Sequence, residues 1–146
     1  MNSNNHITVD QIKNDAEVIK KELVEWRHYL HAHPELSFKE ERTTHYIVNK
    51  LKNFGYTDIQ IGFGPLKTGV MVEIGSGRPC VMLRADIDAL PIQEQTGVEF
   101  CSQSKGVSHA CGHDAHITNL LGVAKLLKKY ENSIKGRVKL LFQPAE

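Results

Sequence analysis

The stretch Pro79-Cys-Val-Met-Leu-Arg-Ala-Asp-Ile-Asp-Ala-Leu-Pro91 joins an apolar run to two aspartates. The uninterrupted apolar residues 81–83 predict a buried strand that is covered on both faces. Two more short segments rich in β-branched residues, 58–61 and 69–74, predict further strands. Gly75-Ser-Gly77 predicts a turn that joins the last two strands as a hairpin.

Helical patterns precede these strands. Between residues 10 and 30 apolar side chains recur at three- and four-residue steps, which predicts a long amphipathic helix. The helix is expected to end at His31-Ala-His33-Pro34, because a residue before proline avoids helical backbone angles. Ser37 and Glu40 have the spacing of a capping box and predict the start of a second helix, which Gly55 ends.

The remaining elements flank a long polar segment, residues 92–110. A third helix is expected from about His113, and the mainly apolar segment 138–142 predicts a further buried strand. Helices that alternate with strands indicate an α/β domain with a layered sheet flanked by helices. We therefore divide the chain into a disordered leader, residues 1–9, and a domain that covers residues 10–146.

The charge and the hydropathy of the chain argue against two classes of protein, those that bind nucleic acids and those that span a membrane. The chain carries 18 basic and 17 acidic side chains, a net charge of +1, which argues against a nucleic-acid partner because such proteins are usually clearly basic. No apolar run approaches the roughly 20 residues of a membrane helix, and the start lacks the apolar core of an export signal, so we expect a cytoplasmic protein. In a reducing compartment Cys80, Cys101 and Cys111 are expected to be core thiols, ligands or nucleophiles rather than disulfides.

The first chemical cluster is the pair Asp86 and Asp88, directly after the most apolar strand. Sites in open α/β sheets gather at the carboxyl ends of strands. If the backbone is extended, both side chains point to the same side. The pair can supply a metal ligand or an acid that orients one. Alternatively, the segment is only a turn in which Arg84 pairs with one aspartate.

The second cluster is Ser108-His-Ala-Cys-Gly-His-Asp-Ala-His116. Here Cys111 and His113 can reach one cation, with Gly112 permitting the tight backbone, while Asp114 can hold an imidazole N–H. Mixed sulfur and nitrogen donors suit zinc, cobalt, nickel or manganese. A metal-ligand pair is the favoured interpretation. A cysteine nucleophile with a histidine base, or a buried cysteine among surface histidines, are the alternatives.

Two other groups carry weaker signals. Glu146, just past the strand at 138–142, can act as a general base toward a metal-bound water, although its spacing alone favours a solvated loop glutamate. Three further histidines lie near the end of the first helix, where His28 and His31 fit the polar face. We interpret His28, His31 and His33 as structural.

Taken together, Arg84-Ala-Asp-Ile-Asp-Ala-Leu-Pro91, His109-Ala-Cys-Gly-His-Asp-Ala-His116 and Phe142-Gln-Pro-Ala-Glu146 resemble successive motifs of the aminoacylase/carboxypeptidase-like metallopeptidase family. They are similar to its amidohydrolase branch, which includes hippurate, N-acyl-amino-acid and indole-acetyl-amino-acid hydrolases. Trp26-Arg-His-Tyr-Leu30 and His33-Pro-Glu-Leu-Ser37 resemble the family's start. The resemblance covers nearly the whole chain and concerns the amino-terminal part of such enzymes.

The resemblance implies an α/β catalytic domain with two divalent metal ions and a smaller lid domain that this chain lacks. It implies that a water between the metals attacks the amide bond of N-acyl amino acids or small peptides. By position, Cys111 and His113 would be metal ligands. Asp88 would orient or polarise the site, and Glu146 would be the general base. Asp86, Asp114 and His116 would contact and orient these ligands rather than bind the metal themselves.

The same resemblance leads to expectations for the whole molecule. The chain is expected to be an incomplete part of an enzyme, because the family's second glutamate and remaining histidine ligands lie downstream. It would therefore bind metal weakly by itself, since closed sites use about four ligands. A homo-oligomer through the lid domain is a further expectation. The alternatives are a non-catalytic interaction module and a hydrolase with Cys111 as its nucleophile.

Overall fold

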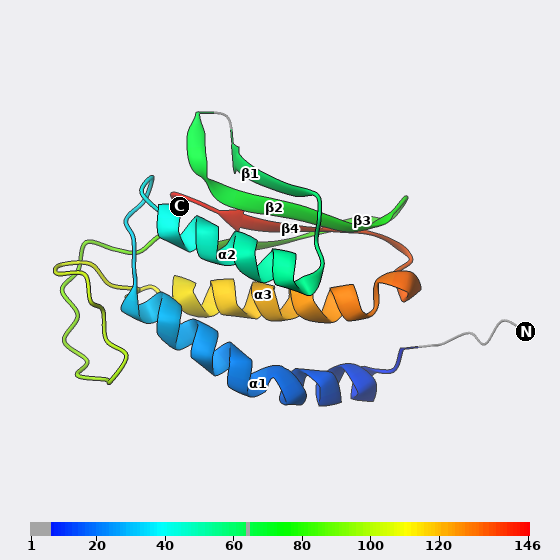
Figure 1. Cartoon of the computed structure of the whole chain (residues 1–146), viewed down its shortest axis with the longest axis horizontal. Helices are drawn as coiled ribbons and strands as arrows, with labels where there is room; N and C mark the ends of the chain where they lie inside the picture. Colours follow the sequence, from blue (N-terminus) through cyan, green and yellow to red (C-terminus); the bar gives the residue numbers. More distant parts are fainter. Residues whose placement is uncertain (1–6, 64) are drawn as a thin grey trace, which may run out of the picture.

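The computed structural model describes residues 7–63 and 65–146 (Figure 1). Its layers are a four-stranded sheet, the helices α2 (Glu41–Phe54) and α3 (His113–Lys129) packed beneath it, and α1 (Val9–Ala32) packed on α3. The other elements are β1 (Ile59–Phe63), β2 (Leu66–Ser76), β3 (Cys80–Asp86), the short helix η1 (Glu131–Ser133) and β4 (Gly136–Gln143). The predicted α/β class with a layered sheet and helices is confirmed.

The strand order β1-β2-β4-β3 differs from the predicted hairpin. Strand β2 is antiparallel to both β1 and β4, while β3 runs parallel to β4. Because β4 lies between β2 and β3, the turn at residues 75–77 does not close a hairpin, and that prediction is wrong. The hairpin is formed by β1 and β2 instead. Turn residues indicate a local reversal of the chain, whereas β4 begins about 60 residues after this turn.

Strand β3 lies at the edge of the sheet and β4 at its centre. Val81, Met82 and Leu83 are 52%, 56% and 38% exposed, so the predicted coverage of both faces is wrong for the described chain. By contrast, Leu140 and Phe142 of β4 are completely buried. Both strands are mainly apolar at residues 81–83 and 138–142, and their different burial follows from their positions in the sheet.

The core lies between the sheet and the helices. The predicted apolar face of α3 is confirmed, since Ile117, Leu120, Leu121 and Ala124 are buried. Each fully buried side chain of this size contributes about 1.5–3 kcal/mol relative to an exposed one. Other large buried side chains include Trp26, Leu30, Ile47, Leu51, Val70, Val72, Leu140 and Phe142.

Helix α1 begins slightly earlier than predicted. The Thr8 hydroxyl accepts a hydrogen bond from the backbone N–H of Gln11, whose side chain in turn accepts one from the Thr8 N–H, which forms a capping box. Thr8 and Val9 therefore belong to the helix start rather than to the predicted leader, and residues 1–6 of that leader lie outside the described residues. No helix within the described ranges is long and apolar enough to cross a membrane.

The predicted cap of α2 is wrong. Ser37 does not cap this helix, whose first residues are held by the Glu35 carboxylate. That carboxylate accepts hydrogen bonds from the backbone N–H groups of Arg42, at 3.1 Å, and Thr43, at 2.7 Å. Residue 36 pairs with residue 89 in a short β-bridge, which turns Ser37 toward the end of β3 and away from the helix.

The long segment 87–112 is held against α1 and the following turn. The Ala89 N–H donates to the carbonyl of Glu35 at 2.8 Å, and the Gln103 N–H donates to the carbonyl of Ala32 at 2.9 Å. Leu90 and Ser108 exchange backbone hydrogen bonds of 3.0 Å in both directions. These contacts fix the path of the chain between β3 and the start of α3.

Candidate functional site

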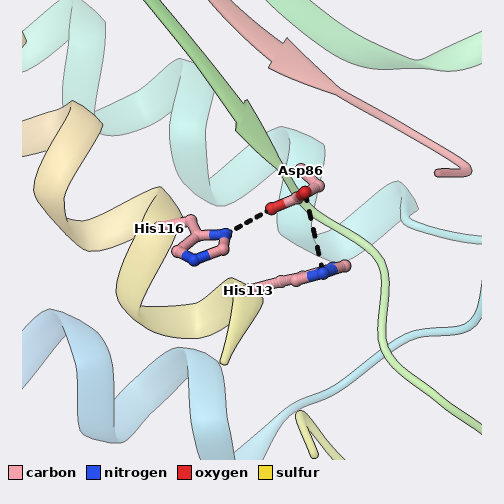
Figure 2. A group of neighbouring side chains, drawn as sticks. All are labelled: Asp86, His113 and His116. Carbon is pink, nitrogen blue, oxygen red and sulfur yellow. Dashed lines mark hydrogen bonds and ion pairs between the residues drawn. The ribbon is translucent and has the colours of Figure 1, made fainter. Parts of the chain in front are cut away.

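The site lies where β3 ends and α3 begins (Figure 2). Parallel pairing of β3 with β4 sets Asp86 opposite Gln143, so the residues after each strand emerge at the same edge of the sheet. Helix α3 starts at His113 directly after Gly112, whose φ of 85° lies in the left-handed region that favours glycine. The sheet and this tight turn together bring the three sequence motifs to one place.

His113 is the centre of the site and is 3% exposed. Its Nδ1 lies 2.9 Å from the Asp88 carbonyl oxygen and 3.2 Å from Asp88 Oδ1. Because a carbonyl oxygen can only accept, we assign the proton to Nδ1. Its Nε2 faces Asp86 Oδ2 at 3.6 Å and Glu146 Oε2 at 3.2 Å. The predicted pair Asp86 and Asp88 thus reaches the same imidazole, one aspartate at each ring nitrogen.

This arrangement fits a cation. With the proton on Nδ1, the neutral ring of His113 directs the Nε2 lone pair toward the carboxylates of Asp86 and Glu146. A lone pair and two carboxylates repel one another unless a proton or a metal ion lies between them. Nitrogen and carboxylate oxygen are common donors to divalent metals. The donor set around His113 therefore suits such an ion.

His116 joins the same group from the next turn of α3. Its Nδ1 lies 2.5 Å from Asp86 Oδ1, and potential ligand atoms of Asp86, His113 and His116 all lie within 4.8 Å of one another. Burial acts to raise the pKa of Asp86, but contacts with its neighbours, the hydrogen bond from His116 above all, outweigh it and hold this pKa below its usual value. Asp86 and His116 were expected only to orient the ligands, but their own ligand atoms lie close enough to His113 to reach the candidate ion.

Arg84 also contacts the site. Its Nη1 lies 3.6 Å from Asp86 Oδ2 and its Nη2 lies 3.8 Å from Glu146 Oε1, while its Nε donates to Gln143 at 2.6 Å. The pairing of Arg84 with one aspartate is therefore present. It does not make the segment a simple turn, because Asp86 contacts two histidines as well.

Cys111 stands apart from this close group. Its side chain is exposed, and it is not among the three residues whose ligand atoms lie within 4.8 Å of one another. His109, the nearest histidine before it, is 4% exposed, and neither ring nitrogen has a hydrogen-bond partner in the described structure. Burial lowers the pKa of His109 to about 4. His109 therefore makes no hydrogen bond that would activate Cys111 as a nucleophile.

Asp114 holds an imidazole, as predicted, but the ring belongs to His31 of α1. Asp114 Oδ2 lies 2.8 Å from His31 Nδ1 and 3.3 Å from Arg27 Nε. Sequence reasoning interpreted His31 as structural and did not find this contact. It also missed Ser37, whose hydroxyl donates to Asp88 Oδ2 at 2.6 Å. His31 and Ser37 are far from their partners in the sequence, so no local sequence pattern predicts either contact.

Comparison with known proteins supports the resemblance. Residues 82–146 match Peptidase family M20/M25/M40. The chain is 44% identical over 142 residues to the N-acyl-L-amino acid amidohydrolase of Geobacillus stearothermophilus, covering 96% of this chain and 38% of that protein. The chain thus spans less than half the length of this relative.

Two solved structures are similar to this fold. One is a putative aminohydrolase from methicillin-resistant Staphylococcus aureus, with a TM-score of 0.87 and 42% identity over 95% of this chain and 37% of that one. The other is a dinuclear metal-binding peptidase of the M20 family from Bacillus subtilis, with a TM-score of 0.79 and 47% identity. It is matched over 89% of this chain and 36% of its own. The predicted resemblance to the amino-terminal part of such proteins is confirmed.

Proposed function

Because the chain is related in sequence and fold to the amino-terminal part of M20 hydrolases, we propose that the protein is a metal-dependent hydrolase. Its substrates would be N-acyl amino acids or small peptides, cleaved at the amide bond. One observation carries the proposal: Asp86, Asp88 and Glu146 converge on the two ring nitrogens of the buried His113. Core packing does not require three carboxylates around one imidazole, since buried charges are costly unless they are paired.

The proposed cofactor is a pair of divalent ions, with manganese, zinc, cobalt and nickel as candidates. His113 and Cys111 would be ligands from this chain. The Nε2 of His113, which faces the carboxylates of Asp86 and Glu146, supports the first, and the accessible thiol next to the left-handed Gly112 supports the second. Such ions, when bound, lower the pKa of a coordinated water and polarise the amide carbonyl. Asp86 and His116 are the adjacent donors that would complete or orient the ligand set.

Glu146 is proposed as the proton acceptor. Its side chain is 50% exposed and can therefore reach both solvent and substrate, while its Oε2 lies 3.2 Å from His113 Nε2. In this role the carboxylate takes a proton from the attacking water and returns it to the leaving amine. Arg84 lies 3.8 Å from the other oxygen and limits the directions in which the carboxylate can turn.

Asp88 is proposed to position His113. Its carbonyl and carboxylate both face Nδ1 of the ring, which fixes the tautomer and leaves Nε2 free to bind. The hydroxyl of Ser37 in turn donates to the second carboxylate oxygen of Asp88. This chain of contacts would hold the imidazole in a single orientation.

Two finer points complete the proposal. The protein would work in the cytoplasm, and it would form a homo-oligomer through the lid domain that the family resemblance implies. Cell fractionation tests the first point, and gel filtration with light scattering tests the second. Activity in a membrane or exported fraction, or a monomer at working concentration, would contradict them.

The central experiment measures metal content and hydrolysis of N-acetyl amino acids by the 146-residue chain and by any longer product of its gene. His113→Asn and Cys111→Ala are compared with Cys101→Ala, a matched exposed cysteine outside the site. We expect the first two variants to lose metal and activity and the third to retain both. If Cys111→Ala keeps both, the thiol is not a ligand. If no variant changes metal content, the proposal fails.

A further inference from the structure

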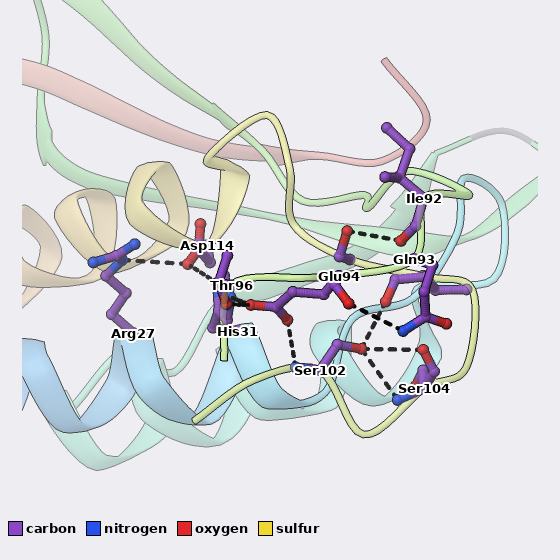
Figure 3. A network of polar contacts seen from close by, with 11 residues as sticks. Arg27, His31, Ile92, Gln93, Glu94, Thr96, Ser102, Ser104 and Asp114 are labelled. Atoms are coloured by element: carbon purple, nitrogen blue, oxygen red, sulfur yellow. Dashed lines mark hydrogen bonds and ion pairs between the residues drawn. The ribbon is translucent and has the colours of Figure 1, made fainter. Parts of the chain in front are cut away.

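His31 lies between two buried carboxylates. Its Nδ1 is 2.8 Å from Asp114 Oδ2 and its Nε2 is 3.0 Å from Glu94 Oε1 (Figure 3). The side chains of His31, Asp114 and Glu94 are only 12%, 1% and 6% exposed. His31 belongs to α1, Glu94 to the long segment after β3, and Asp114 to the first turn of α3. One ring therefore joins three parts of the chain.

The chemistry of these contacts requires a charged ring. Ionised carboxylates can only accept hydrogen bonds, so both ring nitrogens of His31 must donate, which is possible only for the imidazolium. Burial acts to lower the pKa of His31, but the hydrogen bonds to Glu94 and Asp114 outweigh it and raise this pKa. Arg27, on the same face of α1, is the other cation that contacts Asp114, at 3.3 Å. His109, the remaining titratable neighbour, is kept neutral by burial.

The two carboxylates that bind His31 restrain different segments of the chain. Glu94 accepts hydrogen bonds from the Ser102 backbone N–H at 2.5 Å and from the Thr96 hydroxyl, so it folds the long segment back on itself. Asp114 is the residue directly after His113 and lies in the same helical turn. Fixing Asp114 and Glu94 to α1 therefore restrains the segment between them, which contains Cys111.

From this geometry we propose that His31 is a positioning residue: as an imidazolium it clamps the segment 92–112 and the first turn of α3 to α1, and thereby places Cys111 and His113 for metal binding. The metal part of this statement rests on the proposed function, whereas the clamp itself does not. His31 touches neither proposed ligand, and acts through Asp114 and Glu94.

The chain offers matched variants for a test. His31→Gln removes the charge and one of the two donors, while His31→Arg restores a cation with several donors. The control is His45→Gln, because His45 is exposed on α2 and its Nδ1 donates to the Glu41 carbonyl of the same helix at 2.7 Å. Circular dichroism confirms that each variant keeps its fold before the comparison is made.

Two measurements then separate a positioning role from a merely structural one. The first is amide hydrogen exchange of Ser102, held by Glu94, and of Ala115, in the first turn of α3. The second is affinity for Co²⁺ from its absorption spectrum. We expect His31→Gln to speed exchange at both amides and to weaken Co²⁺ binding by about tenfold or more, because charged hydrogen bonds are lost. His31→Arg should recover most of both effects, and His45→Gln should change neither.

Titration of the wild type gives a second route that does not depend on His31→Gln folding. A raised pKa means that the clamp contributes fully below about pH 6.5, the ordinary value for histidine, and is lost as the pH rises through the raised value. Unfolding free energy of the wild type should therefore fall over that range relative to His31→Arg. Parallel curves for the two proteins would overturn the clamp.

The outcomes distinguish the two proposals. Equal exchange in His31→Gln and His45→Gln overturns the clamp. Faster exchange with unchanged Co²⁺ affinity overturns the positioning role. If the wild type binds no Co²⁺ at all, the proposed function fails, while the exchange data still decide whether the clamp exists.

Discussion

His109 and His113 lie four residues apart, and both are almost inaccessible, at 4% and 3% exposure. Their surroundings nevertheless differ completely. His113 has Asp88 at one ring nitrogen and two carboxylates at the other, whereas His109 has no hydrogen-bond partner within the described residues. Burial is the main cause of the lowered pKa of His109, but no group in the described structure forms a hydrogen bond with its ring. The partners around a histidine, more than its depth, mark it as functional.

The largest difference between these two histidines should appear in metal binding. His113→Asn removes a proposed ligand and is expected to weaken Zn²⁺ binding by more than the roughly hundredfold that loss of a supporting residue costs. His109→Asn should change the affinity by less than about fivefold, or under about 1 kcal/mol. Isothermal titration calorimetry measures both. Equal losses would show that His109 also reaches the metal.

A second comparison concerns Asp88, the residue that contacts His113 but forms no hydrogen bond with His109. Asp88→Asn weakens the contact to His113 Nδ1 and should lower metal affinity and hydrolysis by about 10- to 100-fold. Asp58→Asn, in an exposed position outside the site, is the matched control and should change neither. Unchanged activity in Asp88→Asn would mean that the carbonyl of residue 88 is enough to orient the ring.

Stability should change in opposite directions at the two histidines. His109→Leu removes unpaired buried nitrogens and is expected to be neutral or to stabilise the metal-free fold by up to about 1–3 kcal/mol. His113→Leu leaves Asp88 without its partner and should destabilise by a similar amount. Urea unfolding of both variants provides the test. A strong loss in His109→Leu would reveal a partner that this ring has in solution.

The smallest effect on metal affinity is expected at Ser37, which contacts His113 only through Asp88. Ser37→Ala removes the 2.6 Å hydrogen bond to Asp88 and should reduce metal affinity by about threefold to tenfold, the range for one hydrogen bond. Ser76→Ala, at the exposed end of β2, is the control. Loss of activity without loss of affinity in Ser37→Ala would place this hydroxyl on the substrate rather than behind His113.

Several elements could be predicted from the sequence because they depend on local patterns. The helical stripe of α3 and the start of that helix at His113 follow from apolar spacing and from Gly112. The close approach of the motifs around Asp86, Asp88 and His113 was also anticipated, although the structure adds His116 to the close group and leaves Cys111 outside it. A spacing of two residues permits a shared ligand site but does not determine where each side chain points.

Other predictions failed for non-local reasons. Residues 81–83 and 138–142 are both mainly apolar, and nothing local shows that the second segment is central and the first lies at an edge. Ser37 and Glu40 have the capping-box spacing. However, the Glu35 carboxylate accepts hydrogen bonds from the first turn of α2, and the Ser37 hydroxyl donates to Asp88. In each case a distant segment competes for the residue, and the long-range contact prevails.

By itself, the sequence determined the residue types that can bind a metal or move a proton, the helices, the α/β class and the family resemblance. These follow from periodicity, turn residues and motif spacing, which are properties of neighbours along the chain. The tertiary structure decided the strand order, the orientation of His113 between Asp86 and Asp88, and the contact of His31 with Asp114 and Glu94. Such contacts join residues tens of positions apart, and only the packed sheet and helices bring them within hydrogen-bond distance.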